Sequence, residues 1–403
     1  MSFPMTSTST QPEARRAPTT LPAYVLRMPG ETLLAYGQNG SPPAGALDTL
    51  ADRTERYFSE NRGGPDVLVG ALPYDPAMSA HLIQPERVLR VQGRHDLASL
   101  SGLEGSPSAR IGSSGIVVTA DPAAEIFGMA VARGLEALAV PGTDLRKIVL
   151  SRSLKVSARN AFSVAELLRR LAGDDGVTAF VTPLPSRHKT PRYLVGATPE
   201  LLLEKRGANV ASHPLAGSAR RHADEAADRQ SADMLLRSDK DRREHAMVVE
   251  AIMDLLAPHC RALSTPDGTA LKATASMWHL GTRICGKLKD ASISSQRLAA
   301  LLHPTPAVCG MPRNLAHRVI GDLEVYDRDF YAGAVGWCDS AGDGRWFVSI
   351  RCAEIEGKQA RLYAGAGIVP GSTPEGEVAE TAAKFRAMLD AFGIDAACVD
   401  GKE

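Results

Sequence analysis

Short apolar runs between turn formers dominate the second half of the chain and predict β-strands. Runs of this kind at 147–156, 179–184 and 193–198 are rich in β-branched residues, which favour a pleated backbone. Segments 345–356 and 359–369 predict the two arms of a hairpin that turns at Glu356-Gly357-Lys358. In the first arm, side chains are expected to alternate between two faces, with Trp346, Val348, Ile350 and Cys352 on one face and Phe347, Ser349 and Arg351 on the other.

Two segments carry the period of an amphipathic helix. In 239–257, apolar residues from Met247 to Leu256 recur at the three- and four-residue spacing of one buried face. A second helix is expected to begin at Thr373 and Pro374, a capping residue followed by proline, and to end near Gly393. Hairpins combined with such helices, rather than regular β-α-β alternation, favour an α/β fold of the α+β type. We therefore expect large, mainly antiparallel β-sheets flanked by helices.

The first half of the chain carries fewer signals. Strand-like runs occur at 67–74 and 115–120, among loops rich in Gly, Pro and Ser. Residues 1–20 are rich in Ser, Thr, Pro and Arg without an apolar period, which predicts a disordered tail. A length of 403 residues by itself suggests two or three domains.

Composition and charge exclude several classes of protein. Lys plus Arg and Asp plus Glu each number 46, so the neutral chain lacks the field that would attract nucleic acid or an anionic membrane. No apolar stretch approaches the roughly 20 residues of a membrane span, and the N-terminal segment has no apolar region of a signal peptide. The six cysteines are widely spaced, which favours reduced thiols over a zinc site or disulfides. A cytoplasmic protein is expected.

Acidic residues on the two predicted helices are candidates for metal ligation. Glu377, Glu380 and Lys384 share one helix face, and Glu244 lies along the buried stripe of the other helix. Inward-facing carboxylates are costly unless they are paired or bound to a cation, and Mg²⁺ prefers such oxygen donors. The alternative is that these acids interact with helix dipoles and solvated partners, which is the commoner role of acids at helix starts.

Three further residues have both a chemical and a structural interpretation. Lys147 begins an apolar strand, where it either extends to water or is buried and acts as a base. Glu200 follows the turn at Thr198-Pro199 and is either exposed there or presented into a cleft as an acid. Arg351 lies within an apolar run, where its guanidinium needs either an internal ion pair or a carboxylate ligand.

The glycine-rich segment 365–371 invites a dinucleotide-binding interpretation, which fails. Its spacing is G-x-G-x-x-x-G, and Pro370 interrupts it. Its backbone N–H groups remain suited to holding a carboxylate. His279 falls in a predicted strand, where a core histidine is commoner than a ligand. The sequence contains no phosphate-binding loop, zinc-protease motif or G-x-S-x-G motif.

Several short motifs are each only modest evidence for a protein family, but their order along the chain is highly specific. Between about residues 144 and 393 the chain carries, in sequence, KIVLSRSL (147–154), VGATPELL (195–202), PLAGSARR (214–221), KDRREH (240–245), HPTPAVCGMP (303–312), GWCDS (336–340), SIRCAEI (349–355) and AGAGIVPGSTPEGEVAET (364–381). This set resembles the chorismate-utilising enzymes, which include isochorismate synthases, salicylate synthases, anthranilate synthase component I and aminodeoxychorismate synthase component I. The resemblance implies one chorismate-binding domain over residues 21–395, in place of the two or three that length suggests.

Particular positions within this resemblance imply the reaction. Lys147 matches the general base of isochorismate synthases, whereas family members that use ammonia carry another residue there. Ala216 stands where aminodeoxychorismate synthases have a nucleophilic lysine. Ala307 stands where salicylate synthases have a threonine linked with pyruvate elimination, although Tyr331 also fits those enzymes. The resemblance thus favours isochorismate as the product, formed by a monomer without a glutaminase subunit.

The resemblance also implies roles for individual residues. Lys147 would activate water for attack at C2 of chorismate, and a protonated Glu200 would donate to the departing C4 hydroxyl. The implied Mg²⁺ ligands are Glu244 and Glu380, with Glu377 nearby through water. The implied substrate-binding residues are Gly217, Ser218, His279, Ala307, Tyr331, Arg351, Gly365, Gly367 and Lys384.

The sequence therefore implies a magnesium-dependent enzyme that converts chorismate to isochorismate, for a siderophore built from 2,3-dihydroxybenzoate or salicylate. One alternative is a salicylate synthase, which would also release pyruvate. Another is a chorismate-binding paralogue without activity. The presence of Lys147, Glu200, Glu244 and Glu380 together counts against it, because a silent protein has no chemical need for all four.

Overall fold

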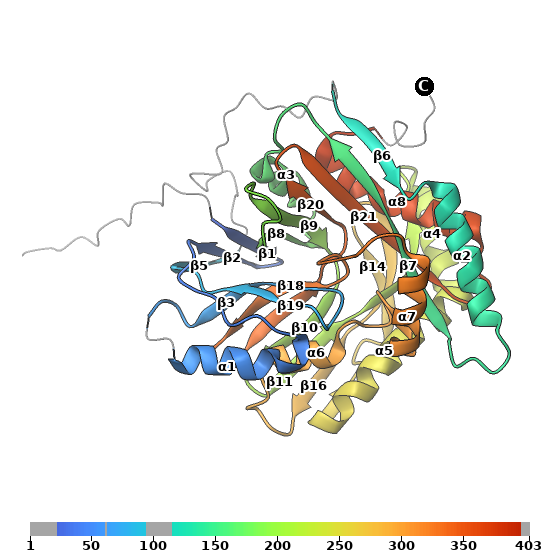
Figure 1. Ribbon diagram of the computed structural model, residues 1–403. Coiled ribbons are helices and arrows are strands. Elements are labelled where there is room, and N and C mark those ends of the chain that lie inside the picture. The colour runs from blue at the N-terminus through green and yellow to red at the C-terminus, as the bar shows by residue number, and fades with distance from the viewer. Residues whose placement is uncertain (1–21, 61–62, 94–114, 396–403) are drawn as a thin grey trace, which may run out of the picture.

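A computed structural model describes residues 22–60, 63–93 and 115–395. Its strands form two large sheets and one small sheet, with helices packed around them (Figure 1). Every strand pairing within the described ranges is antiparallel, which confirms the predicted α/β fold with mainly antiparallel sheets. The predicted tail at 1–20 lies outside the described residues.

The largest sheet has ten strands. In spatial order they are β17 (Gly310–Met311), β7 (Lys147–Ser157), β21 (Gln359–Ile368), β20 (Cys352–Glu356), β9 (Arg192–Thr198), β8 (Thr178–Leu184), β1 (Tyr24–Met28), β2 (Glu31–Tyr36) and β5 (Arg87–Gln92), and β6 (Val117–Asp121) also pairs with β7. The three strands predicted at 147–156, 179–184 and 193–198 are therefore confirmed as β7, β8 and β9, each within a residue of its expected bounds.

The second sheet has eight strands, and a third has three. The eight, in spatial order, are β13 (Cys260–Ser264), β16 (Ile284–Leu288), β11 (Asn209–His213), β10 (Leu201–Arg206), β19 (Gly344–Val348), β18 (Ala334–Asp339), β3 (Val67–Leu72) and β4 (His81–Ile83). The three are β12 (Leu215–Arg220), β15 (Met277–Thr282) and β14 (Thr269–Ala273).

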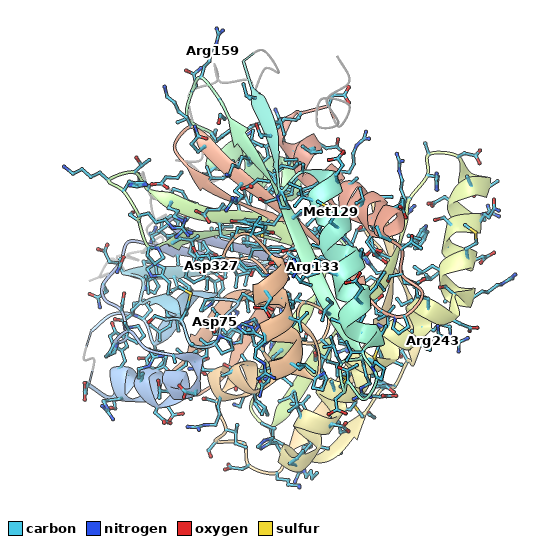
Figure 2. The ribbon with its side chains drawn as sticks, turned by 45° about the vertical axis from the view of Figure 1, so that its right-hand side comes forward. Asp75, Met129, Arg133, Arg159, Arg243 and Asp327 are labelled. Atoms are coloured by element: carbon cyan, nitrogen blue, oxygen red, sulfur yellow. The ribbon has the colours of Figure 1, made fainter. Side chains whose placement is uncertain are left out.

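The helices surround the sheets. They are α1 (Leu50–Glu60), α2 (Ala124–Ala139), α3 (Val164–Leu171), α4 (Glu225–Arg237), α5 (Asp239–Leu256), α6 (Ser295–Leu302), α7 (Arg313–Leu323) and α8 (Pro374–Phe392). On α2, Phe127 is buried, whereas Met129 and Arg133 lie on the outward side (Figure 2). Within the described ranges, no helix is long and apolar enough to span a membrane.

Both predicted helices that bear acidic residues are confirmed. The hydroxyl of Ser238 caps α5 by accepting from the Asp241 amide, and Thr373 caps α8 by accepting from Gly376. At the far end of α8, Gly393 has the left-handed φ of 69° that ends many helices. These caps fix where each helix begins, and therefore the positions of Glu244 on α5 and of Glu377 and Glu380 on α8.

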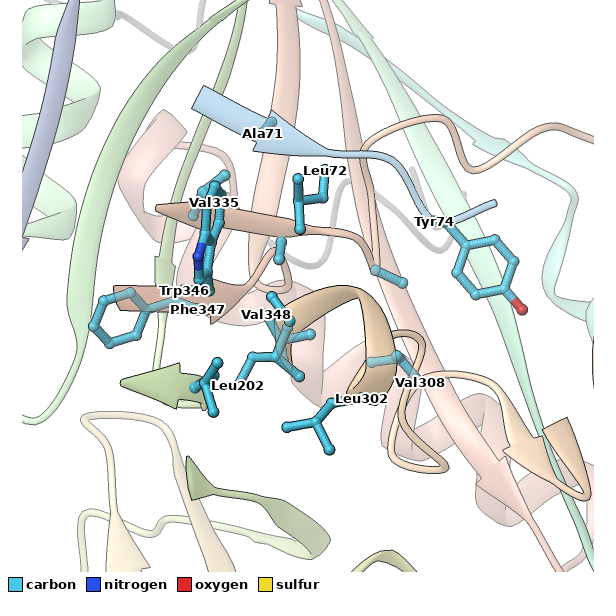
Figure 3. Close-up of a cluster of buried hydrophobic side chains, with 14 of the residues drawn as sticks. Ala71, Leu72, Tyr74, Leu202, Leu302, Val308, Val335, Trp346, Phe347 and Val348 are labelled. Carbon is cyan, nitrogen blue, oxygen red and sulfur yellow. The ribbon is translucent and has the colours of Figure 1, made fainter. Parts of the chain in front are cut away.

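Two hydrophobic cores lie on opposite faces of the ten-stranded sheet. On β1, Tyr24 and Leu26 belong to one core and Val25 to the other, as the two-residue period of a strand requires. One core includes Trp346 of the eight-stranded sheet, which Figure 3 shows among side chains of neighbouring strands, while the other includes Phe385 of α8. The first core draws on residues from Tyr24 to Ile368, so both halves of the chain share it. The two or three domains suggested by length are therefore wrong.

The strand predicted at 345–356 is not continuous. It ends as β19 at Val348 in the eight-stranded sheet and resumes as β20 at Cys352 in the ten-stranded sheet. Arg351, between them, has a φ of 52°, a left-handed conformation that cannot continue a pleat. The predicted alternation of faces from 346 to 352 is therefore wrong, whereas the turn at Gly357, between the paired residues Glu356 and Gln359 of β20 and β21, is confirmed.

The cysteines within the described ranges are all free. Cys260, Cys309, Cys338 and Cys352 are buried and Cys285 is half-buried, as the prediction of reduced thiols requires. Cys398 lies outside the described residues.

Candidate active site

One cavity gathers nearly all the predicted site residues. It encloses about 690 Å³ of empty space, open mouth included. Its wall includes Glu200, Gly217, Ser218, Glu244, His279, Ala307, Tyr331, Arg351, Gly365, Gly367, Glu380 and Lys384. The two remaining predicted residues, Lys147 and Glu377, are not in the wall. Lys147 forms an ion pair with Glu244, and Glu377 lies within electrostatic reach of Glu380.

Lys147 is completely buried at the first position of β7, so the interpretation that it extends to water is wrong. Its Nζ lies 3.0 Å from Oε1 of Glu244. Both side chains approach Gly367 of the neighbouring strand β21. A Cβ at this position would lie 2.2 Å from Oε1 of Glu244 and 3.2 Å from Cε of Lys147. The absence of a side chain at Gly367 therefore gives both charged groups the space they occupy beside the cavity.

Glu200 lies where the chain crosses from β9 in one large sheet to β10 in the other. It is only 3% exposed, so the exposed-turn interpretation is wrong. Burial raises the pKa of its carboxyl to about 8, against the opposing influence of Lys147 and a hydrogen bond from the Leu215 backbone. At neutral pH this carboxyl is mostly protonated and can donate a proton into the cavity.

Arg351 has no acidic partner within ion-pair distance among the described residues, so the interpretation of an internal ion pair is wrong. Its guanidinium makes only 3.5 Å contacts, with the backbone oxygen of Lys384 and with Nε2 of His279. Burial lowers its pKa to about 10, which still leaves it charged at neutral pH. A buried cation without an anion, in a cavity wall, is suited to binding a carboxylate.

His279 lies in the cavity wall on β15 and is nearly completely buried. Burial, followed by the charges of Arg351 and Lys384, holds its pKa well below the usual range, so the ring is neutral. The ring also forms a hydrogen bond with the backbone of Gly217. This histidine is both a packed core residue and part of the site, whereas the sequence interpretation set these two roles against each other.

The predicted metal-binding glutamates are paired with lysines in the structure. Besides the Lys147–Glu244 pair, Glu380 accepts from Lys384 at 2.6 Å and from the Ser218 hydroxyl at 3.2 Å. Glu377, 1% exposed, accepts from Lys240 at 2.8 Å. The interpretation of solvated helix-start acids is wrong for Glu377 and Glu244, which are both buried.

The donor chemistry of these acids fits a hard divalent cation. Glu244 and Glu380 present carboxylates from two helices to one cavity, and Oε2 of Glu377 is buried without a hydrogen-bond partner among the residues that the structure describes. Burial and the neighbouring Glu380 raise the pKa of Glu377, against the opposing charge of Lys240. In the part of the chain that the structure describes, no three acidic, His or Cys side chains converge tightly enough to form a metal centre by themselves.

Some wall residues were not predicted from the sequence. Tyr363 of β21 stacks on Tyr331 with ring centroids 4.7 Å apart and planes 8° from parallel, and both line the cavity. Pro199 and Leu215 also line it. Pro199 and Leu215 lie within motifs already recognised and Tyr363 directly precedes one, so their place in or beside those motifs was the available signal.

Comparisons with known proteins show the family of the chain. Residues 88–393 match the family model described as chorismate binding enzyme. The chain belongs to the family of chorismate-binding enzymes, which confirms the resemblance inferred from the ordered motifs.

Individual relatives extend the similarity over most of the chain. It is 42% identical over 386 residues to isochorismate synthase DhbC of Bacillus subtilis (strain 168), covering 93% of this chain and 94% of that protein. It is 41% identical over 329 residues to isochorismate synthase EntC of Escherichia coli (strain K12), covering 81% of each. The crystal structure of DhbC from Bacillus anthracis matches with a TM-score of 0.84 and 37% identity, covering 93% of this chain and 97% of that one.

Proposed function

We propose that this protein is an isochorismate synthase, which converts chorismate to isochorismate by adding water at C2 and releasing the C4 hydroxyl. The observation that carries the proposal is the pair of groups at the cavity. A buried lysine, Lys147, and a glutamic acid that is protonated at neutral pH, Glu200, influence each other electrostatically. A reaction in which water adds at one carbon while hydroxide leaves another requires a base and an acid of this kind.

Each group has a defined task in the proposed reaction. Lys147 takes a proton from the attacking water. Glu200 donates its proton to the departing C4 oxygen, so the double bonds shift as one water adds and another leaves. Arg351 binds the pyruvyl carboxylate of chorismate, which serves as the anionic partner of its guanidinium. Backbone N–H groups around Gly365 and Gly367 hold the same carboxylate. The neutral ring of His279 lies beside the substrate without adding charge.

We propose Mg²⁺ as the cofactor, held by Glu244 and Glu380 with Glu377 nearby. When bound, the ion would neutralise and orient the ring carboxylate of chorismate. Lys384, which pairs with Glu380, also donates to the Gly365 backbone oxygen at 2.8 Å. Ser218 orients Glu380 through the hydrogen bond described above.

A salicylate synthase is the second candidate, because Tyr331 lines the cavity. Ala307, also in the wall, offers no hydroxyl at the position linked with pyruvate elimination in those enzymes. We therefore propose that the reaction stops at isochorismate.

The proposed biological setting is siderophore biosynthesis through 2,3-dihydroxybenzoate or salicylate. It is supported by the description of the Bacillus anthracis relative as a 2,3-dihydroxybenzoate-specific isochorismate synthase. We further propose that the protein acts in the cytoplasm, where free cysteines such as those of this chain remain reduced. It would act there as a monomer, and it would need no glutaminase subunit because water rather than ammonia is the nucleophile.

The test is incubation of purified protein with chorismate and Mg²⁺, with chromatographic separation of products and a parallel pyruvate assay. Isochorismate without stoichiometric pyruvate is expected, EDTA should abolish its formation, and ammonium should yield no amino product. Salicylate with equal pyruvate would instead establish the second candidate. No turnover in any condition would leave a chorismate-binding protein without activity.

A further inference from the structure

Lys272 is a cation near the active site that neither the motifs nor the cavity wall include. It lies on β14, half-buried, opposite His279 in the register of the three-stranded sheet. Its Nζ donates to the backbone oxygen of Pro199 at 2.9 Å. Pro199 lines the cavity and directly precedes Glu200. Lys272 therefore links the small sheet to the crossing between the two large sheets.

The positive charge of Lys272 interacts with the carboxyl of Glu200 in the active site. Among the described residues, no carboxylate lies within ion-pair distance of its Nζ. The acidic groups that interact electrostatically with Lys272 are Glu200 and Asp174. Both carboxylate oxygens of Asp174 already accept backbone hydrogen bonds, from Gly176 and Ala275. The amine also influences His213 and His279, both of which are held neutral by burial. Glu200, whose carboxyl receives one backbone hydrogen bond, from Leu215, is thus the acidic group near Lys272 that lies in the cavity wall.

We propose that Lys272 is a positioning residue for Glu200: it fixes the Pro199 turn by its hydrogen bond and sets, by its charge, the pH range over which Glu200 serves as a proton donor. The proposal rests on the assignment of Glu200 as the acid of the proposed reaction. Other cations face Glu200 from different elements, namely Lys147 of β7, Lys384 of α8 and Arg351 of the 349–351 crossing. Lys147 and Lys384 also contact the glutamates assigned to the metal, whereas Lys272 contacts none of them, so it can be changed without disturbing that group.

The sign of the effect follows from electrostatics. A nearby positive charge favours the ionised carboxylate and lowers its pKa, in opposition to burial. Removing the amine in K272M should therefore keep Glu200 protonated to higher pH. We expect a shift of about one pH unit, at the low end of what an opposite charge within reach contributes.

The first measurement needs no substrate. The difference in unfolding stability between E200Q and the wild type should grow with pH and level off where Glu200 ionises in the folded protein, because stability follows the protons bound in the two states. We would repeat this comparison between K272M and K272M/E200Q. The levelling-off point should lie about one pH unit higher in the K272M pair, and K272R should restore the wild-type position.

The second measurement uses turnover. If the Glu200 pKa rises by one unit from about 8, the ratio of kcat/KM at pH 8.5 to that at pH 7.0 should increase about threefold in K272M over the wild type. K289M is the matched control, because Lys289 also donates to a prolyl oxygen, that of Pro258, at 2.8 Å, and it is exposed outside the cavity wall. It should change neither readout.

The outcomes separate the two proposals. An unchanged levelling-off point in K272M, or K272R behaving like K272M, overturns the role of Lys272 whether or not chorismate turns over. A wild type that forms no isochorismate overturns the proposed function, while the stability series still measures the Lys272–Glu200 interaction. Should K272M fail to fold, K272Q removes the charge while keeping a polar side chain, and the same shift is expected.

Discussion

Glu200→Gln should make the folded protein more stable while abolishing turnover. The wild-type carboxyl is buried, and its pKa is raised from 4.5 to about 8. Ionisation therefore favours the unfolded state, so the wild type loses stability as pH rises from about 4.5 to about 8. Glutamine is neutral at every pH, keeps a carbonyl for the Leu215 amide, and avoids this loss. Without an ionisable proton it cannot serve as the acid of the reaction.

The size of the effect follows from the two pKa values. Each pH unit between them corresponds to about 1.4 kcal/mol. From 4.5 to pH 7 is about 2.5 units, so the variant should gain roughly 3 kcal/mol over the wild type at neutral pH. Above pH 8 the difference should level off at roughly 5 kcal/mol, and near pH 5 it should be below about 1 kcal/mol.

Denaturant unfolding of both proteins at pH 5, 6, 7 and 8.5 measures this difference. Glu136→Gln, the same chemical change at an exposed position of α2, is the matched control and should stay within about 0.5 kcal/mol of the wild type throughout. A stability difference for E200Q that does not change with pH would refute the reasoning, because it would mean that Glu200 is already ionised in the fold. Wild-type turnover by E200Q would refute the acid assignment separately.

Three further changes test the rest of the site. Lys147→Ala should lower kcat by about 10²–10⁴-fold while calorimetry still detects chorismate binding; undiminished turnover would remove Lys147 as the base. Gly367→Ala places a Cβ 2.2 Å from Oε1 of Glu244 and should raise the Mg²⁺ concentration for half-maximal activity by about tenfold or more. Gly321→Ala, which meets no atom within 4 Å, should not change that concentration, and equal values for both variants would contradict the Glu244 assignment. Ala307→Thr should introduce pyruvate release, and an assay without pyruvate would show that this position alone does not decide the product.

The sequence predicted the regular elements well because their signals are local. The β-branched residues of β7 and the Thr373-Pro374 start and Gly393 end of α8 can each be recognised within a few neighbouring residues. The break at 349–351 could not be predicted in this way. Nothing in the local pattern shows that Trp346 and Cys352 pack in different sheets, because that depends on partners more than 100 residues earlier in the chain, at Leu203 and Gly196.

The candidate site shows the same division between local and distant information. The ordered motifs located the residues that line the cavity, because a family pattern summarises the fold that brings them together. Burial decided the alternatives that spacing had left open. Lys147 and Glu200 proved to be buried, and Arg351 proved to have no acidic partner in the described part of the chain. Lys272 belongs to no motif, and its contact with Pro199, which only the structure reveals, connects it to the site.

The two crossings between the large sheets also bear on how the site meets its substrate. Glu200 lies on one crossing and Arg351 on the other, and the crossings are joined by backbone hydrogen bonds from Val348 to the Glu200 oxygen and from Ala197 to the Arg351 oxygen. The proton donor and the carboxylate anchor are therefore preorganised by the framework of both sheets, so little conformational entropy remains to be lost on binding. A single residue inserted into either crossing would shift donor and anchor relative to one another, which makes the lengths of these two short segments as restricted as the identity of the residues they carry.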